Sequence, residues 1–414
     1  MTRAHARGAC PGLSAPMVTG DGLLARLIPA GPIPLDAFIG LCEAAGAHGN
    51  GTMEISARGS LQIRGLNPVS APLFAAQIAA LAIDICESVP VIADPLPDDP
   101  AALIDTNAIA AALLQAIAEK ALPLAPKISI VVDGGGRLDL DALFADIRLR
   151  AVATSEGPRF HVTLAGDGAS ARAVGIIAPD EALDAVLALL TAIAELGPDA
   201  RGADLLRAHG VTGSRIGAAP MPATQSRTDA IGLHPLKGGA FALGLGLAFG
   251  HAHADALVRL AEIARRTGAR WTRPAPDRAL LLGPLSEANA TATARDAQEL
   301  DFIVEADDPR RRIVACPGAP ACAHGLIAAR ALAAEIAREL PLPGGQGVAL
   351  HVSGCTKGCA HPSPAPLTIV GTEHGCGVIV DGTAREAPAR YIDPSELIAA
   401  LRPAGHNTRE AVNA

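Results

Sequence analysis

Apolar and polar residues alternate in a similar order along two stretches that lie far apart in the chain. The first stretch predicts a strand, a helix and a pair of strands, at residues 22–29, 34–45 and 52–66. The second predicts a strand, a helix and a strand, at residues 241–247, 255–266 and 278–283. It begins about 220 residues after the first, and self-similarity at a fixed spacing indicates an internal duplication.

A longer segment of mixed helix and strand patterns follows each stretch. In the first half it predicts helices at 104–118 and 180–196, and strands at 127–132, 160–165 and 174–177. In the second half it predicts a helix at 323–340 and strands at 348–352, 367–370 and 378–380. We expect residues 197–237 to connect the halves. The pattern therefore predicts a mixed α+β protein in which two small units alternate with two α/β segments.

Composition supports a globular protein of several domains. The chain has 414 residues, of which 50% are hydrophobic, only 2% aromatic and 18% charged, so its core must be built from Ala, Leu, Ile and Val. This length fits roughly two to four domains. The net charge of −8 argues against nucleic-acid binding, which needs a concentrated basic face. We find no signal-peptide pattern and no apolar run long enough for a bilayer, so we expect a soluble cytoplasmic protein with no membrane partner.

Four of the eight cysteines form two closely spaced pairs. Cys316 and Cys322 lie in a loop rich in Pro and Gly, and Cys355 and Cys359 come directly after a predicted strand. A cubane [4Fe-4S] cluster needs four thiolates, and the predicted helix start beside Cys322 would add a favourable dipole. Structural zinc or simple burial is the alternative, but zinc sites more often have two residues between paired cysteines. The spacing therefore favours a [4Fe-4S] cluster.

The other cysteines have a simpler interpretation. Cys42 lies on an apolar helical face, Cys86 follows apolar residues, and Cys376 lies in a glycine-rich turn. Core packing or chance explains each of them better than chemistry does. The role of Cys10 stays open.

The cysteine spacing, the duplication and two motifs resemble the nitrite and sulfite reductase family. The motifs are Ala-Cys-Pro-Gly-Leu-Ser-Ala-Pro-Met at 9–17 and Ser-Gly-Cys-Thr-Lys-Gly-Cys-Ala-His-Pro at 353–362. The resemblance covers nearly the whole chain. It implies two ferredoxin-like half-domains, at 12–82 and 230–295, that alternate with two α/β domains, at 83–215 and 300–405. The second α/β domain would carry the cluster.

The resemblance also implies an activity. The Lys-Gly-Cys-Ala-His-Pro ending points to a branch of the family that acts on a free tetrapyrrole, because the sirohaem reductases usually have Pro-Asn in the corresponding interval. Members of this branch are monooxygenases of aerobic cobalamin synthesis. They oxidise precorrin-3A with O₂ and reducing equivalents, which come from NADH or an electron-donating reductase, and form a C20 hydroxyl and a ring A lactone.

The resemblance further implies a mononuclear non-haem iron, whose ligands the sequence does not reveal. His251, His253 and Asp255 superficially offer two His and a carboxylate. They lie at a predicted helix start, however, where Asp255 is a natural N-cap. We therefore assign no ligands to this iron. His324, His351 and His361 lie near the cysteine loops and are candidates for hydrogen bonds to the cluster or the substrate.

A substrate rich in acetate and propionate groups calls for basic partners in a protected pocket. The residues that match the family's tetrapyrrole-binding motifs are Arg26, Arg58, Gln62, Arg64 and Lys127. Arg58, Gln62 and Arg64 share the same parity along an extended segment, so one face could present all three. Taken singly, each arginine would more often be a solvated surface charge.

Two other functions compete with this interpretation. A sirohaem-dependent sulfite or nitrite reductase would bridge its haem iron through one cluster thiolate. The reductases, however, carry a second basic residue where this chain has Ser129, so its anion-reducing apparatus looks incomplete. A non-enzymatic iron–sulfur electron carrier is the other alternative, and it would have little use for duplicated halves and a basic pocket.

Overall fold

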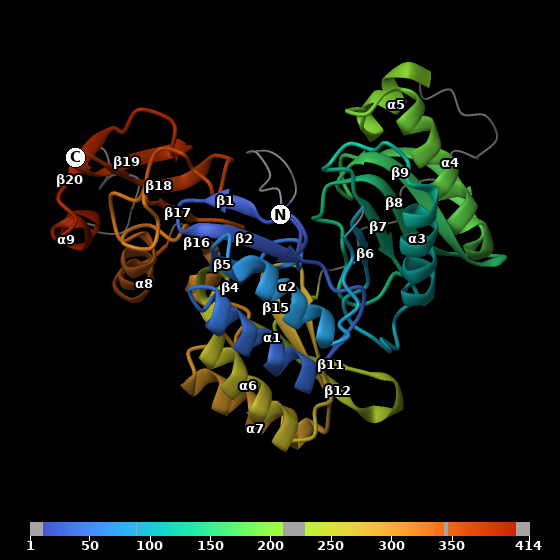
Figure 1. Ribbon diagram of the computed structural model, residues 1–414, viewed down its shortest axis with the longest axis horizontal. Coiled ribbons are helices and arrows are strands. Elements are labelled where there is room, and N and C mark those ends of the chain that lie inside the picture. Colours follow the sequence, from blue (N-terminus) through green and yellow to red (C-terminus); the bar gives the residue numbers. More distant parts are fainter. Residues whose placement is uncertain (1–10, 88, 210–227, 343–346, 403–414) are drawn as a thin grey trace.

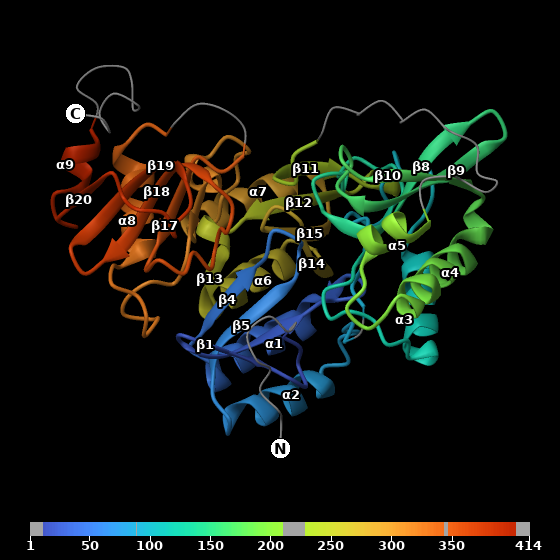
Figure 2. The ribbon, with the colours of Figure 1, turned by 90° about the horizontal axis from the view of Figure 1, so that it is seen from above.

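The described part of the chain forms four five-stranded sheets, two in a central body and one in each of two flanking α/β domains (Figure 1). The computed structural model describes residues 11–87, 89–209, 228–342 and 347–402. Figures 1 and 2 show the α/β domains on opposite sides of the central body. The duplicated, mixed α+β fold predicted from the sequence is confirmed. The predicted domain ends at 215 and 405 lie outside the described residues.

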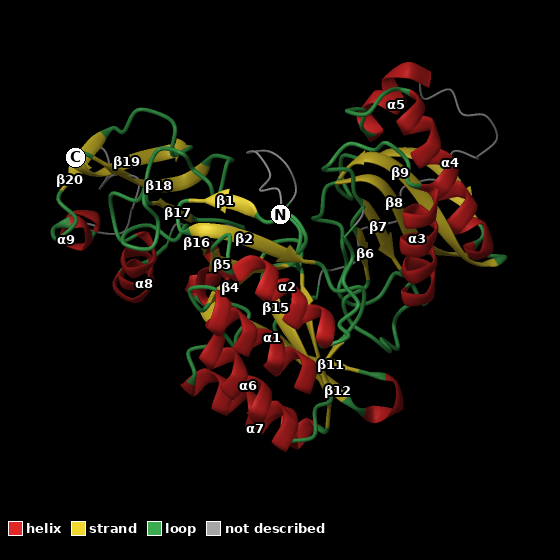
Figure 3. Cartoon of the chain, in the orientation of Figure 1, coloured by secondary structure: helices red, strands yellow, loops and turns green. Residues whose placement is uncertain are grey.

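Two sheets and four helices build the central body. Sheet 1 has the strand order β1 (Met17–Thr19), β2 (Gly22–Leu27), β5 (Leu61–Leu66), β4 (Thr52–Ile55) and β13 (His251–His253). Sheet 2 has the order β11 (Gly232–Pro235), β12 (Phe241–Gly246), β15 (Ala279–Leu285), β14 (Trp271–Ala275) and β3 (Ile33–Pro34). The helices, which gather on one side of the body in Figure 3, are α1 (Leu35–His48), α2 (Ser70–Ala80), α6 (Ala254–Arg266) and α7 (Glu287–Glu299).

The two small units exchange a strand. β3 pairs with β14 in sheet 2, and β13 pairs with β4 in sheet 1. These strands are equivalent in the duplication, because β3 and β13 begin 218 residues apart, at Ile33 and His251, as do β5 and β15, at Leu61 and Ala279. Apolar side chains of both units, such as Phe38 and Leu260, form one continuous core. The units therefore fold as one body.

Each α/β domain repeats the same sheet. The first contains β6 (Val91–Ala93), α3 (Asn107–Lys120), β7 (Ile130–Asp133), β8 (Ala145–Thr154), β9 (Gly157–Gly166), β10 (Arg172–Ile177), α4 (Ala182–Glu195) and α5 (Gly202–His209). The second contains β16 (Ile313–Ala315), α8 (Ala329–Glu339), β17 (Leu350–Ser353), β18 (Ala365–Thr372), β19 (Gly375–Gly382), β20 (Arg390–Ile392) and α9 (Leu397–Leu401). In both sheets the strands lie side by side in chain order. The first three strands are parallel to one another, and each of the last two pairs antiparallel with the strand before it.

Each central sheet contacts the α/β domain of the other half. Glu54 of β4 accepts an ion-paired hydrogen bond from Arg330 of α8. Arg273 of β14 donates to Asn107, the first residue of α3, at 3.2 Å. The halves therefore interlock through their α/β domains as well as through the exchanged strands.

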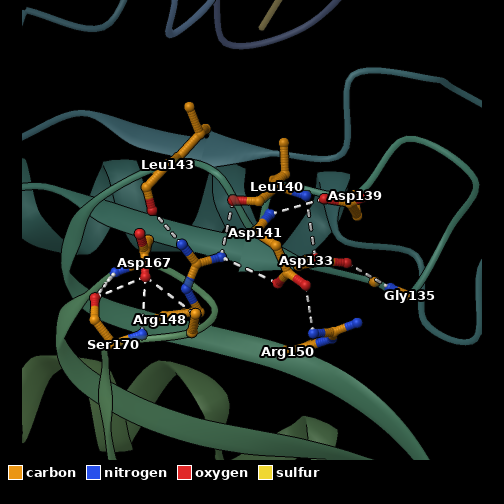
Figure 4. Close-up of polar contacts among 12 residues, drawn as sticks. Asp133, Gly135, Asp139, Leu140, Asp141, Leu143, Arg148, Arg150, Asp167 and Ser170 are labelled. Carbon is orange, nitrogen blue, oxygen red and sulfur yellow. Dashed lines mark hydrogen bonds and ion pairs between the residues drawn. The ribbon is translucent and has the colours of Figure 1, made fainter. Parts of the chain in front are cut away.

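Three expectations about the elements are corrected. The helix predicted at 323–340 begins only at Ala329, so no helix starts beside Cys322. The sequence pattern does not predict the strand β8, and the predicted connection at 197–237 contains α5 and β11. β8 carries Arg148, whose guanidinium is buried and donates to the carbonyls of Leu140 and Leu143, so a charged residue interrupts the apolar pattern (Figure 4).

Within the described ranges, none of the helices combines the length and the apolar character that a membrane crossing requires.

Candidate functional site

A row of polar side chains crosses sheet 1. Arg26 of β2 lies opposite Gln62 of β5, Gln62 lies opposite Glu54 of β4, and Glu54 lies opposite His251 of β13. Residues directly opposite one another in a sheet share a face. The intervening residues of the same strands, Ala25, Ile63 and Met53, are buried in the central core on the other face. Sheet 1 thus presents a polar face toward the second α/β domain.

Two guanidinium groups in this site are held by carboxylates. Arg64 makes two hydrogen bonds of 2.7 Å to Asp21 and one of 3.2 Å to Glu54. Glu54 also accepts from Arg330. Burial lowers the pKa of Arg64, but Glu54 and Asp21 together raise it above its ordinary value. Glu54 therefore links sheet 1 to α8, and its carboxylate is the negative charge that Arg64 and Arg330 share.

His251 lies at the end of the polar row and is neutral at physiological pH. Burial, together with the positive charges of Arg330 and Arg64, lowers the pKa of His251 to about 3. Its Nδ1 is buried, and none of the described residues forms a hydrogen bond with it. The ring stacks on Phe249, with 6.3 Å between the ring centroids.

The two cysteine loops of the second α/β domain pack together. Sγ of Cys316 accepts the backbone N–H of Gly354, which precedes Cys355, at 3.0 Å. The N–H of Leu326 donates to the carbonyl of Gly354 at 2.7 Å. Burial raises the pKa of Cys316 even though N–H groups of Gly354 and Gly318 lower it, and the neighbouring Cys355 and Cys322 raise it further. Three of the four paired cysteines are therefore neighbours.

In the described part of the chain, including the two cysteine loops, no three His, Cys, Asp or Glu side chains lie close enough to hold one metal ion. The thiolates of a cubane cluster bind different irons and stand further apart than the donors to a single ion. The backbone N–H groups around Cys316 suit an anionic sulfur site. The two loops thus supply closely packed cysteines and backbone N–H donors, which is the donor set that an anionic, sulfur-rich group needs.

A cavity of about 250 Å³ joins the polar face to the cysteines. The residues that line it include Glu54, Gln62, Arg64, Arg278, Cys316 and Cys359. Basic and amide groups of β5 and of the β14–β15 turn therefore meet thiols at one opening, which suits an anionic ligand.

The structure does not bring all predicted substrate residues to this cavity. Arg58 lies in the turn between β4 and β5 and forms an isolated backbone bridge with Pro276 of the β14–β15 turn. Lys127 is exposed just before β7 of the first α/β domain, where its carbonyl accepts from Arg201 at 2.9 Å. The described contacts of Lys127 do not reach the cavity, so its role in substrate binding stays a prediction.

The histidine candidates divide between surface and core. His253, not Asp255, caps α6: its Nδ1 accepts the N–H of Asp255 at 3.4 Å. The side chains of His253 and Asp255 are 57% and 85% exposed, and they do not fit a protected iron site. His324 is also exposed. His351 is fully buried and meets His361 edge-on, with 5.6 Å between the ring centroids.

Sequence reasoning missed Asp21, Glu54, Arg278 and Arg330. The alternation at 52–66 already places Glu54 on the face that carries Gln62, so parity was an available signal for Glu54. No local pattern marks Arg330, because its partner lies 276 positions away.

The remaining cysteines lie away from this cavity or outside the described residues. Cys42 is buried in the central core and Cys376 in the core of the second α/β domain, in β19 rather than in a turn. Cys86 donates to the carbonyl of Val89 at 3.5 Å. Cys10 lies outside the described residues.

Comparisons with known proteins agree with this architecture. Residues 16–81 match the nitrite/sulfite reductase ferredoxin-like half domain. A precorrin-3B synthase from Sinorhizobium sp. is 38% identical over 415 residues, which cover 98% of this chain and 89% of that protein. The NirA protein of Mycobacterium tuberculosis shares the fold, with a TM-score of 0.68 at 17% identity over 95% of this chain and 84% of that one.

Proposed function

This chain belongs to the precorrin-3B synthase family, and from that membership we propose that it converts precorrin-3A to precorrin-3B. The reaction is a monooxygenation that uses O₂ and two reducing equivalents, hydroxylates C20 and closes a lactone on ring A. The observation that carries the proposal is the 38% identity to a precorrin-3B synthase over nearly the whole chain.

We propose that Cys316, Cys322, Cys355 and Cys359 hold a [4Fe-4S] cluster. The packing of the two loops and the N–H donated to Sγ of Cys316 support this ligand set. When bound, such a cluster would pass single electrons to the reaction. NADH or a separate reductase would be the source of those electrons. The described residues offer no fitting site for a mononuclear iron.

The chain's own residues would bind and orient the substrate. The polar row that begins with Arg26 and Gln62 offers hydrogen bonds and positive charge to carboxylates of the tetrapyrrole. We propose Arg26, Arg58, Gln62, Arg64 and Lys127 as substrate-binding residues. Arg64 would act at least partly through Glu54 and Asp21, which already hold its guanidinium. His251 lies at the end of the row and, being neutral, would add no charge to the binding face.

Incubation with precorrin-3A, O₂ and a reductant tests the function. Mass analysis of the product should show the gain of one oxygen atom and a spectrum consistent with a lactone. Label from ¹⁸O₂ should enter the hydroxyl group. Unchanged precorrin-3A in the presence of a fully loaded enzyme would contradict the proposal.

A sirohaem-dependent reductase is the second candidate, because the fold is shared with NirA. An absorption spectrum of protein purified without oxygen separates the two functions. A sirohaem Soret band would favour the reductase, whereas broad iron–sulfur absorption alone would favour the synthase. An electron carrier would show that broad absorption too, but would not bind a polycarboxylated tetrapyrrole.

A further inference from the structure

Arg278 lies at a strained position of the β14–β15 turn. Asp277 and Arg278 have φ angles of 61° and 62°, so two successive residues adopt the left-handed conformation. Glycine and asparagine usually occupy such positions, and a long side chain there is uncommon. Strained backbone of this kind gathers at ligand sites.

A second strained turn makes room for the Arg278 side chain. Phe249 has a φ of 56° and is followed by Gly250, whose φ is 81°. A Cβ at Gly250 would lie 2.5 Å from Cδ of Arg278, so only glycine leaves space for this side chain. Phe249, Gly250 and Arg278 all line the cavity that contains Cys316 and Cys359. The two turns thus direct one guanidinium to the cavity.

Arg278 differs in its partners from Arg64, which also lines the cavity, and from Arg330, which pairs with the cavity residue Glu54. Arg64 is paired with Asp21 and Glu54, and Arg330 is paired with Glu54. Among the described residues, none forms a hydrogen bond or ion pair with the guanidinium of Arg278. Burial lowers its pKa, although the charges of Asp277 and Glu54 raise it. A half-buried guanidinium of this kind can still gain charge-assisted hydrogen bonds from an anion.

We propose that Arg278 is a substrate-binding residue that takes a carboxylate of the tetrapyrrole from the side of the second half. The cavity of about 250 Å³ is smaller than the usual range of roughly 300–1,000 Å³ for pockets that enclose a drug-sized ligand. One edge of the macrocycle therefore enters, and Arg278 binds an acetate or propionate of that edge. This inference rests on the proposed function.

Binding of uroporphyrin III, a stable tetrapyrrole with acetate and propionate side chains, tests the inference without turnover. Quenching of its fluorescence gives Kd for the full-length protein and for Arg278→Ala, Arg278→Lys and Arg270→Ala. Arg270 is an exposed arginine just before β14 and is the matched control. Arg278→Ala should weaken binding by roughly ten- to a hundredfold, Arg278→Lys by less, and Arg270→Ala not measurably.

The salt dependence of Kd separates a direct contact from a folding defect. A lost charge contact makes binding less sensitive to ionic strength, whereas a misfolded site weakens binding at all salt concentrations alike. We expect the shallower salt dependence in Arg278→Ala, with a thermal melt like that of the unaltered protein. Equal affinity in Arg278→Ala, or weaker binding with an unchanged salt dependence, would overturn the role of Arg278. Failure of the unaltered protein to bind uroporphyrin III would instead count against the proposed function.

Discussion

Asp94 occupies in the first α/β domain the position that Cys316 occupies in the second. Each residue directly follows the first parallel strand of its domain, β6 or β16. The N–H of Gly134 donates to both carboxylate oxygens of Asp94, at 3.1 and 3.0 Å, as the N–H of Gly354 donates to Sγ of Cys316 at 3.0 Å. Iron–sulfur clusters select soft thiolates, so the same backbone arrangement suits a cluster only in the second half.

Asp94 should make the stability of the protein depend on pH. Burial and the carboxylate of Asp133 raise its pKa from 3.8 to about 7, although Gly134, Thr106 and Arg273 lower it. The folded state therefore keeps this proton up to about pH 7, whereas the unfolded chain releases it near pH 3.8. The stability that the group contributes is fully present below pH 3.8 and is lost as the pH rises to about 7.

Replacing this carboxyl group should flatten the profile. One pKa unit corresponds to about 1.4 kcal/mol. Between pH 3.8 and about 7, the free energy of unfolding of the unaltered protein should therefore fall by a few kcal/mol more than that of Asp94→Asn. Urea unfolding at a series of pH values measures the slope, and Asp105→Asn, an exposed aspartate before α3, is the control. The same slope in Asp94→Asn and in the unaltered protein would show that Asp94 does not titrate in this window.

The four paired cysteines should be individually required for the cluster. Replacing any one of them by Ser should abolish or badly degrade the brown chromophore, because three thiolates seldom hold a cubane firmly. Cys42→Ala and Cys86→Ser should retain it, since these residues lie in the central core and beside Val89. Iron and acid-labile sulfide analysis measures the loss. Full retention in Cys355→Ser would refute the ligand set.

Much of the candidate site can be predicted from local parity, but its ion pairs cannot. The alternation at 52–66 predicts Arg58, Gln62 and Arg64 on one face. In the structure Gln62 and Arg64 lie in β5 and line the cavity, whereas Arg58 lies in the turn before β5. The pairing of Arg64 with Asp21 and of Glu54 with Arg330 joins segments 43 and 276 positions apart. Such pairings depend on the tertiary fold, and the local sequence carries no signal for them.

Among the elements, strands with clean alternation were predicted and irregular ones were missed. β4 and β5 follow the predicted pair at 52–66. β8 was missed because Arg148 and Arg150 interrupt it, and only the fold provides their partners, the Leu140 and Leu143 carbonyls and Asp141 (Figure 4). The late start of α8 also depends on a tertiary contact. The N–H of Leu326 donates to the carbonyl of Gly354 in the other cysteine loop, and the helix begins only at Ala329.

The turn between β1 and β2 packs against the cysteine loop and should influence the cluster. The carbonyl of Gly20 accepts the N–H of Ala323 at 2.8 Å, and a Cβ at Gly20 would overlap Sγ of Cys322. Gly20→Ala should therefore displace either the turn or Cys322 and lower the iron content or the lifetime of the chromophore in air. Gly31→Ala is the control, because no atom of the described residues lies within 4 Å of a Cβ there.

Both variants should unfold at temperatures close to that of the unaltered apoprotein, since neither position belongs to the central core. Equal iron content and equal air stability in Gly20→Ala and Gly31→Ala would show that the turn does not constrain Cys322.

At the scale of the whole molecule, the duplication was predictable and the exchange of strands was not. The repeated alternation reveals two equivalent units, yet β3 and β13 are only two and three residues long and carry no strand signal of their own. Their partners, β14 and β4, lie in the opposite unit. The sequence also leaves open which α/β segment each unit contacts. The structure shows contacts with the opposite one, through Glu54 and Arg330 and through Arg273 and Asn107.

These contacts predict that neither half works alone. A fragment of residues 1 to 215 would lose β13 from sheet 1 and its share of the common core, and it contains none of the paired cysteines. We expect it to lack iron and to aggregate through exposed apolar surface. The remaining fragment would keep the cysteine loops but lose the Gly20 turn and the polar row of Arg26, Gln62 and Glu54. It should bind little cluster and convert no precorrin-3A.

Coexpression of the two fragments is the control for aggregation. The exchanged strands and the shared core give the fragments an extensive interface, so they should copurify and recover both iron content and product formation. The substrate and the cluster would then meet only in the complex, because the cavity is lined by Gln62 and Arg64 from one fragment and by Arg278 and Cys316 from the other. Conversion of precorrin-3A by the C-terminal fragment alone would show that the site does not need the first half.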